Sequence, residues 1–87
     1  MEKFVVTCFY RRDDSTIEMK RSHIVDSDFE GMRYVLEQIE RTKEDYSLSE
    51  EAEFNKNTYG ATNDDFDEAY IMDGDYAYYQ WNITKTI

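Results

Sequence analysis

Residues 26–45 read DSDFEGMRYVLEQIERTKED, and this stretch decides the fold because it is the clearest helix in the chain. Ser27 and Glu30 stand at the spacing of a capping box, in which hydroxyl and carboxylate each satisfy a free N–H at the helix start. Apolar residues then recur at spacings of three or four and form one stripe of Phe29, Met32, Val35, Leu36 and Ile39. We predict a helix over about residues 28–45. Gly31 is a poor helix former, and close packing against a sheet would account for it.

The residues before the helix predict a β-hairpin. Residues 3–11 and 16–24 alternate in hydropathy with the period of β-strands. Asp13 and Asp14 lie between them and favour a tight turn. With a two-residue loop, one face of the hairpin carries the side chains of Phe4, Val6, Cys8, Tyr10, Ile17 and Met19. We expect this apolar face to meet the helix.

The residues after the helix predict a second hairpin. Residues 68–72 and 76–84 are rich in β-formers, and Asp73-Gly74 between them is a preferred type I′ turn. That two-residue loop places on one face Tyr70, Met72, Ala77, Tyr79, Trp81 and Ile83. A three-residue loop would instead turn Ile71 inward, whereas Trp81 faces inward under either loop. The choice between the two loops stays open.

The connection over residues 46–64 carries a weaker pattern. Ser47 and Glu50 repeat the capping-box spacing, and Ala52 with Phe54 could anchor a short helical turn. The letters that follow, NKNTYGATN, are rich in turn formers. We expect a loop with one short helix here.

Together these elements predict a single small α+β domain over residues 1–87, in the order ββαββ. The economical packing is a four-stranded antiparallel sheet with the one main helix packed on one face. The other face of the sheet would then expose the apolar and aromatic side chains of Val5, Phe9, Tyr76 and Tyr78.

Negative charge is concentrated in one third of the chain. Residues 44–75 hold eleven acids and one base, Lys56, and so carry all of the net charge of −10. Aromatic residues lie among these acids: Tyr46, Phe54, Tyr59, Phe66 and Tyr70. An acidic chain repels phosphate backbones and anionic membranes, so direct binding to nucleic acid or membrane is disfavoured. A basic protein surface is the partner that such charge attracts.

Catalysis and cofactor binding have little support in the sequence. The lone His23 has no fixed partner in view, and Cys8 falls on the predicted core face, where it acts as a small hydrophobe. A calcium loop begun at Asp65 fails because Ala69 and Tyr70 occupy its fifth and sixth positions. We expect no enzyme, no cofactor and no resident metal, with an adventitious cation among the carboxylates as the alternative.

Two further features complete this picture. A small basic patch surrounds the first hairpin at Arg11, Arg12, Lys20 and Arg21, and we interpret it as balancing nearby acids. The opening residues, MEKFVVTCFYRR, have too short an apolar run for a signal peptide, and one cysteine allows no internal disulfide. These features favour a cytoplasmic protein.

The stretch 64–70, DDFDEAY, combines acids with aromatics in a small α+β chain that has one cysteine and no catalytic motif. In these respects the chain resembles small acidic phage-encoded inhibitors of bacterial defence, the anti-CRISPR and anti-restriction proteins of the DNA-mimic type. The resemblance is one of class and rests on no shared residue motif. It implies a non-enzymatic protein of the host bacterial cytoplasm that blocks a basic nucleic-acid-binding site on a partner such as a Cas nuclease or a restriction enzyme.

Two sets of candidate binding residues follow. The predicted partner-binding residues are Glu50, Glu51, Glu53, Asp64, Asp65, Asp67, Glu68, Tyr70, Asp73 and Asp75. The predicted secondary interface consists of Phe9, Tyr76 and Tyr78 on the uncovered sheet face. This second set would suit a structural or adaptor protein that binds a partner or, as a homodimer, itself.

Overall fold

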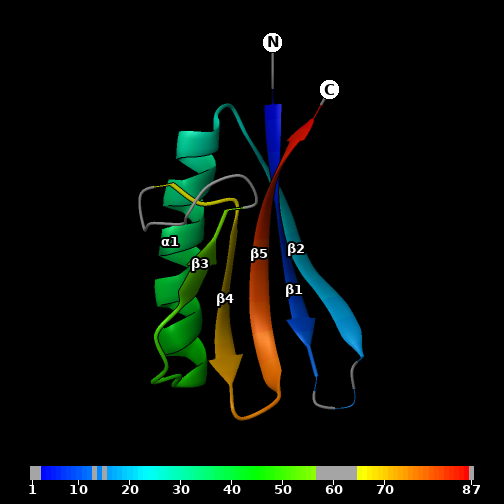
Figure 1. Ribbon diagram of the computed structural model, residues 1–87, viewed down its shortest axis with the longest axis vertical. Coiled ribbons are helices and arrows are strands. Elements are labelled where there is room, and N and C mark those ends of the chain that lie inside the picture. The colour runs from blue at the N-terminus through cyan, green and yellow to red at the C-terminus, as the bar shows by residue number, and fades with distance from the viewer. Residues whose placement is uncertain (1–2, 13, 15, 57–64, 87) are drawn as a thin grey trace.

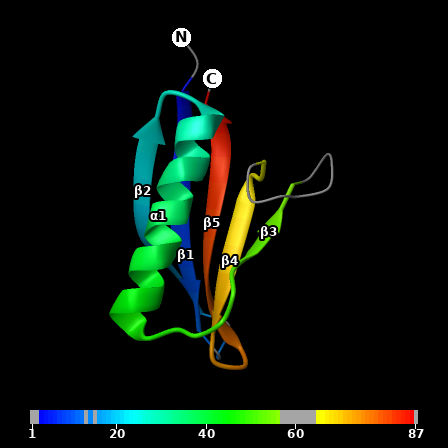
Figure 2. The ribbon, with the colours of Figure 1, turned by 90° about the vertical axis from the view of Figure 1, so that its left-hand side faces the viewer.

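The computed structural model describes residues 3–12, 14, 16–56 and 65–86. The elements follow the order β1 (Lys3–Arg11), β2 (Ile17–Val25), α1 (Asp28–Tyr46), β3 (Glu53–Asn55), β4 (Glu68–Asp73) and β5 (Ala77–Thr86). The strands form one antiparallel sheet in the order β2-β1-β5-β4-β3, and α1 lies across one of its faces (Figures 1 and 2). The predicted α+β class is confirmed, but the described sheet has five strands and not four.

Helix α1 begins and ends as its sequence dictates. The Ser27 hydroxyl accepts a hydrogen bond from the Glu30 N–H at 3.1 Å, and the Glu30 carboxylate accepts one from the Asp26 N–H at 3.1 Å. The predicted capping box is therefore confirmed, with the carboxylate reaching one residue further back than usual. The helix ends where Ser47 adopts the left-handed conformation, and the Leu48 N–H donates to the Lys43 carbonyl at 2.9 Å.

The buried stripe of α1 is narrower than predicted. Met32, Val35 and Ile39 are buried, whereas Phe29 is exposed, so its placement in the stripe was wrong. At about 100° per residue, Phe29 lies roughly a quarter turn from the centre of the buried side. Gly31 lies on that side, and a Cβ there would stand 3.1 Å from Cγ2 of Ile83. Close packing against the sheet explains this glycine.

The first hairpin closes through a longer loop than predicted, and its register changes as a result. Ile17 pairs with Arg11 rather than with Tyr10, because the Arg12 N–H bonds the Thr16 carbonyl at 2.9 Å, one residue later in the chain than a two-residue loop requires. A one-residue slip turns a strand's side chains to the opposite face. Ile17 and Met19 therefore lie on the side away from α1, 64% and 61% exposed, and their predicted place in the core was wrong.

A β-bulge in β2 changes the register again, so that Arg21 and Val25 lie opposite the inward-facing residues of β1. The register shifts between Cys8 and Phe9, so that Cys8 pairs with Arg21 and Phe4 pairs with Val25. The predicted inward positions on β1 are confirmed, with Val6 and Cys8 buried and Phe4 and Tyr10 packed against the core.

The second hairpin has the three-residue loop. Asp73 pairs with Ala77, and Gly74 takes a φ of 85° in the turn between them. Ile71 is consequently buried against α1, while Tyr70 faces the other way. Burial of the fully apolar Ile71 outweighs the local preference for a two-residue turn.

The connection after α1 contains a strand where a short helix was predicted. Residues 53–55 pair with β4, and Phe54 packs on Phe66 with ring centroids 4.7 Å apart. The predicted helical turn anchored by Ala52 and Phe54 was therefore wrong. The loop was predicted over residues 55–63; Asn55 instead belongs to β3, and residues 57–63 lie outside the described residues.

The core lies between α1 and the three central strands. Its largest fully buried side chains are Trp81, Ile71, Val6 and Val35. The core uses only the helix side, and α1 does not cover the opposite side of the sheet (Figure 1).

Candidate functional site

The sheet presents one face that α1 leaves uncovered, on the side of the strands away from the helix in Figure 1, and we name it the open face. Directly paired residues of neighbouring strands share a face, so the registers define its rows. One row crosses all five strands: Glu53, Tyr70, Gln80, Phe9 and Met19. A second row crosses them beside it: Asn55, Glu68, Asn82, Thr7 and Ser22.

Three of the predicted partner-binding residues meet on the open face. Glu53 lies directly opposite Tyr70, and Glu68 stands diagonally from Glu53 across the β3–β4 pair. Diagonal neighbours in an antiparallel pair lie roughly 7–8 Å apart. The open face thus offers two carboxylates beside one phenol at its β3–β4 edge.

The predicted secondary interface adjoins these carboxylates. The rings of Tyr70 and Tyr78 meet edge to face, with centroids 6.0 Å apart. Arg11 donates to the Tyr78 hydroxyl at 3.2 Å and lies over its ring, 5.9 Å from the centroid. A depression of about 230 Å³ beside them is lined by Phe9, Arg11, Ile17, Tyr78, Gln80 and Asn82. Part of each predicted interface therefore lies on the open face: Glu53, Glu68 and Tyr70 of the first, and Phe9 and Tyr78 of the second.

Two other predicted acids lie at the β4–β5 turn, away from the open face. The Asp73 carboxylate faces the helix side, where it accepts a hydrogen bond from the Tyr10 hydroxyl at 3.0 Å. Asp75 is exposed in the turn itself. Tyr76, predicted for the uncovered face, also lies in this turn and is 74% exposed.

The acids at the start of β4 are partly neutralised or shielded. Asp65 forms an ion pair with Lys56 at 2.5 Å, and this hydrogen bond raises the pKa of Lys56. Asp67 is half-buried, and its Oδ1 atom has no hydrogen-bond partner within the described part of the chain. Glu50 and Glu51 are exposed in the connection that precedes β3. Asp64 lies outside the described residues.

The order of the strands converts the charge pattern of the sequence into a pattern in space. Strands β3 and β4 carry a net charge of −3, from Glu53, Glu68 and Asp73. Strands β1 and β2 carry a net +3, from Lys3, Arg11, Lys20 and Arg21 against Glu18. Since β2 and β3 form opposite edges, four strand spacings or about 19 Å separate them. The sheet is therefore acidic at one edge and basic at the other.

The two residues with the most familiar catalytic chemistry have structural surroundings. Burial raises the pKa of the Cys8 thiol to about 11, although Arg21 and Lys20 act against this rise. The thiol is consequently protonated at neutral pH and a poor nucleophile. His23 stacks on Tyr34 with ring centroids 4.3 Å apart. Within the described ranges, no three acidic, histidine or cysteine side chains gather as metal ligands.

Comparisons with protein-family models, curated proteins and solved structures give no match. Within the residues that the structure describes, no helix has the length and apolar character needed to cross a membrane.

Proposed function

We propose that this protein is a non-enzymatic binding protein that presents the acidic edge of its open face to a basic site on another protein. The site would be one that normally binds nucleic acid, as in a Cas nuclease or a restriction enzyme, and the bound protein would block it as a DNA mimic. The observation that carries the proposal is the meeting of Glu53, Glu68 and Tyr70 in strands that contain no base.

Interface chemistry supports this proposal. Arginine and lysine side chains of a nucleic-acid groove bind carboxylates as they bind phosphates, and a tyrosine beside them supplies rigid contact area. Glu50, Glu51 and Asp75 are exposed. They do not belong to the rows of the open face, but their charges add to the negative field around it. Such a field speeds association with a basic partner and makes it sensitive to salt.

A charge-matched pair of variants tests the proposal. The chain should displace duplex DNA from a Cas9-type nuclease or a restriction enzyme in a mobility-shift titration. Glu53→Gln with Glu68→Gln should weaken this displacement about ten-fold or more, because two charged contacts are lost. Glu37→Gln with Glu40→Gln is the control, since it removes the same charge from exposed positions on α1.

Two results would contradict the proposal. One is that the unchanged chain displaces DNA from neither class of enzyme. The other is equal weakening by both double variants, which would assign the effect to net charge rather than to the open face.

A second candidate function is a structural or adaptor role through the apolar part of the open face. The exposure of Ile17 and Met19 beside Phe9 favours it, because contiguous exposed apolar side chains mark interaction surfaces. This role predicts self-association or partner binding that persists at high salt and is lost in Tyr78→Ala. Sedimentation at low and high salt separates it from the acidic mode of binding.

A further inference from the structure

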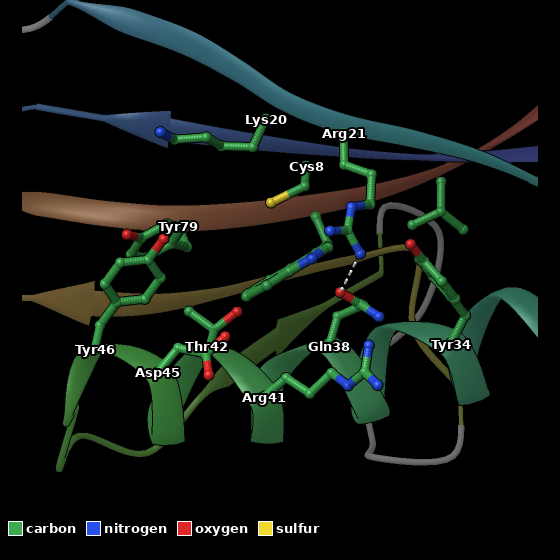
Figure 3. A pocket seen from close by; sticks show the side chains of 12 residues that line it. Cys8, Lys20, Arg21, Tyr34, Gln38, Arg41, Thr42, Asp45, Tyr46 and Tyr79 are labelled. Carbon is green, nitrogen blue, oxygen red and sulfur yellow. Dashed lines mark hydrogen bonds between the residues drawn. The ribbon is translucent and has the colours of Figure 1, made fainter.

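Helix α1 and strand β2 enclose a cavity on the helix side of the sheet, away from the open face. Its volume is about 230 Å³, and its lining comes from β1, β2, β5 and α1 (Figure 3). The inner wall is largely apolar, with Val6, Cys8, Tyr79 and Trp81. The volume is below the roughly 300–1,000 Å³ of drug-sized ligand sites, so only a compact molecule fits.

Basic side chains line the mouth of this cavity. Lys20 and Arg21 extend from β2, and Arg41 extends from α1 toward Tyr34 (Figure 3). Arg21 donates to Gln38 Oε1 at 3.2 Å, which bridges the sheet and the helix. Lys20 and Arg21 belong to the patch that we predicted to balance nearby acids, and Arg41 lies outside that patch.

In the described part of the chain, Arg21 and Arg41 lack the carboxylate partners that they would have if they balanced nearby acids. Lys20 pairs with Glu18 at 3.2 Å, but among the described residues neither Arg21 nor Arg41 forms an ion pair. This is notable because the chain contains twenty acidic residues with which the two arginines could have paired. Asp45 is the acidic residue of the lining, and Arg41 points away from it along the helix (Figure 3).

The negative charge of the acidic edge of the sheet acts weakly at this cavity. The acidic strand β3 lies about 19 Å from β2, whereas charges in physiological salt are screened over about 8 Å. Glu37, Glu40 and Glu44 of α1 lie within about one turn of Arg41, but all three are exposed to solvent, and none of them forms an ion pair with either arginine in the described part of the chain. An anion that reached the cavity would meet two guanidinium groups without carboxylate partners.

We propose that this cavity binds a small molecule that carries a carboxylate or phosphate group on an apolar ring. The guanidinium groups of Arg21 and Arg41 bind the anionic group, since each offers several N–H donors in a fork that matches either group. The ring packs against Tyr79 and Trp81 at the inner wall. Gln38 turns from Arg21 to the ligand as a further hydrogen-bond donor.

The single tryptophan of the chain provides the readout, because Trp81 lines the cavity. We expect saturable changes in Trp81 fluorescence with benzoate or with phenyl phosphate, and weaker binding of inorganic phosphate, which lacks the ring. Comparison of the first two probes decides between carboxylate and phosphate. Backbone amide shifts should map each bound probe to β2 and α1.

A matched pair of arginine variants tests the site. Arg41→Gln should weaken binding of the better probe about ten-fold or more, since a charged hydrogen-bonding partner is lost. Arg33→Gln removes the same charge from an exposed position on the same helix outside the cavity, and binding should be unchanged. Both side chains are exposed, and circular dichroism of each variant verifies that the fold is intact.

Three results would overturn the proposal: no saturable binding of either ring-bearing probe, equal weakening by the two variants, or amide shifts confined to other parts of the molecule. Because Glu53 and Glu68 lie on the opposite face, their double variant should bind the probes normally. The cavity and the DNA-mimic function can thus fail independently.

Discussion

The two halves of the sheet differ in both charge and construction. On one side of β5, strands β1 and β2 are nine residues each and basic, and on the other side β4 and β3 have six and three residues and are acidic. A free edge strand can pair with a strand of another chain, and each half disfavours this in its own way. Strand β2 carries Lys20, Arg21 and a bulge, whereas β3 is short. The shared core therefore leaves the two edges free to take opposite chemistry.

The largest expected effect is on the strand that joins the two halves. Trp81 pairs with Cys8 on one side and Ala69 on the other and is 2% exposed. Trp81→Ala should lower the free energy of unfolding by about 3–5 kcal/mol, through lost burial and the cavity that remains. Urea unfolding followed by circular dichroism measures this loss. Hydrogen exchange should show both halves losing protection together, and loss in one half alone would refute a shared core.

A smaller change should affect the acidic half alone. Phe54 is half-buried, packs on Phe66 and belongs to a strand with only three paired residues. Phe54→Ala should lower the free energy of unfolding by about 2 kcal/mol, which is roughly half the loss for a fully buried phenylalanine. The amides of residues 53–55 should exchange faster, while those of β1 and β2 keep their protection.

The matched control lies in the basic half. Phe4 is also half-buried against the core, but β1 is paired on both sides. Phe4→Ala should therefore lower protection across the whole sheet. If Phe54→Ala and Phe4→Ala gave the same pattern of exchange, the acidic half would not be the more easily opened one.

The sequence predicts the elements of this fold well because their signals are local. The capping box at Ser27 and the apolar periodicity of α1 depend on neighbouring residues, and both gave the correct helix. Loop length in the hairpins depends on more than the turn residues. In the second hairpin the three-residue loop allows burial of Ile71. In the first hairpin the Asp14 carboxylate accepts a bond from the Thr16 N–H at 2.9 Å, which supports a loop longer than two residues. Strand β3 has only three residues, which is too short for an alternation of apolar and polar residues to be recognised.

The candidate site was harder to predict because it is an outcome of register and strand order. Glu53 and Tyr70 are seventeen positions apart in the sequence, and only the pairing of β3 with β4 places them together. Ile17 reached the open face through a one-residue slip. The cavity depends on where α1 crosses the sheet, and no local pattern near Arg21 or Arg41 encodes that crossing.

A titration distinguishes burial from the basic charge around Cys8. Burial raises the pKa of this thiol to about 11 from an ordinary value of 9.0, while Arg21 and Lys20 lower it by a lesser amount. Since the folded state holds the proton more tightly, the thiol's contribution to stability is complete below pH 9.0 and is lost as the pH rises toward about 11. The Cβ chemical shift of Cys8 should titrate accordingly in the folded chain.

The control for this titration is the chain unfolded in urea, where the midpoint should return to about 9.0. Cys8→Ala should lack this part of the alkaline loss of stability. A folded midpoint at or below 9.0 would mean that the basic edge, and not burial, governs the thiol.

The smallest expected effects come from the exposed ion pairs, which respond to pH in opposite directions in the two halves. In the basic half, hydrogen bonds from Lys20 and Arg12 lower the pKa of Glu18, so its contribution to stability is lost as the pH falls through the folded pKa. In the acidic half, Asp65 raises the pKa of Lys56, so that contribution is lost as the pH rises through the folded pKa.

Glu18→Gln and Lys56→Gln should each change stability only slightly, because exposed pairs are hydrated and screened. Thermal unfolding at low salt should reveal a small loss in each variant, and 1 M salt should abolish both losses, since the screening length falls to about 3 Å. Side-chain NMR titrations of the unchanged chain should give a Glu18 midpoint below its ordinary value and a Lys56 midpoint above its own. If Lys56 instead titrated below its ordinary value, its bond to Asp65 would not persist in solution. Asp65 would then be free to join Glu53 and Glu68 in the negative field of the acidic edge.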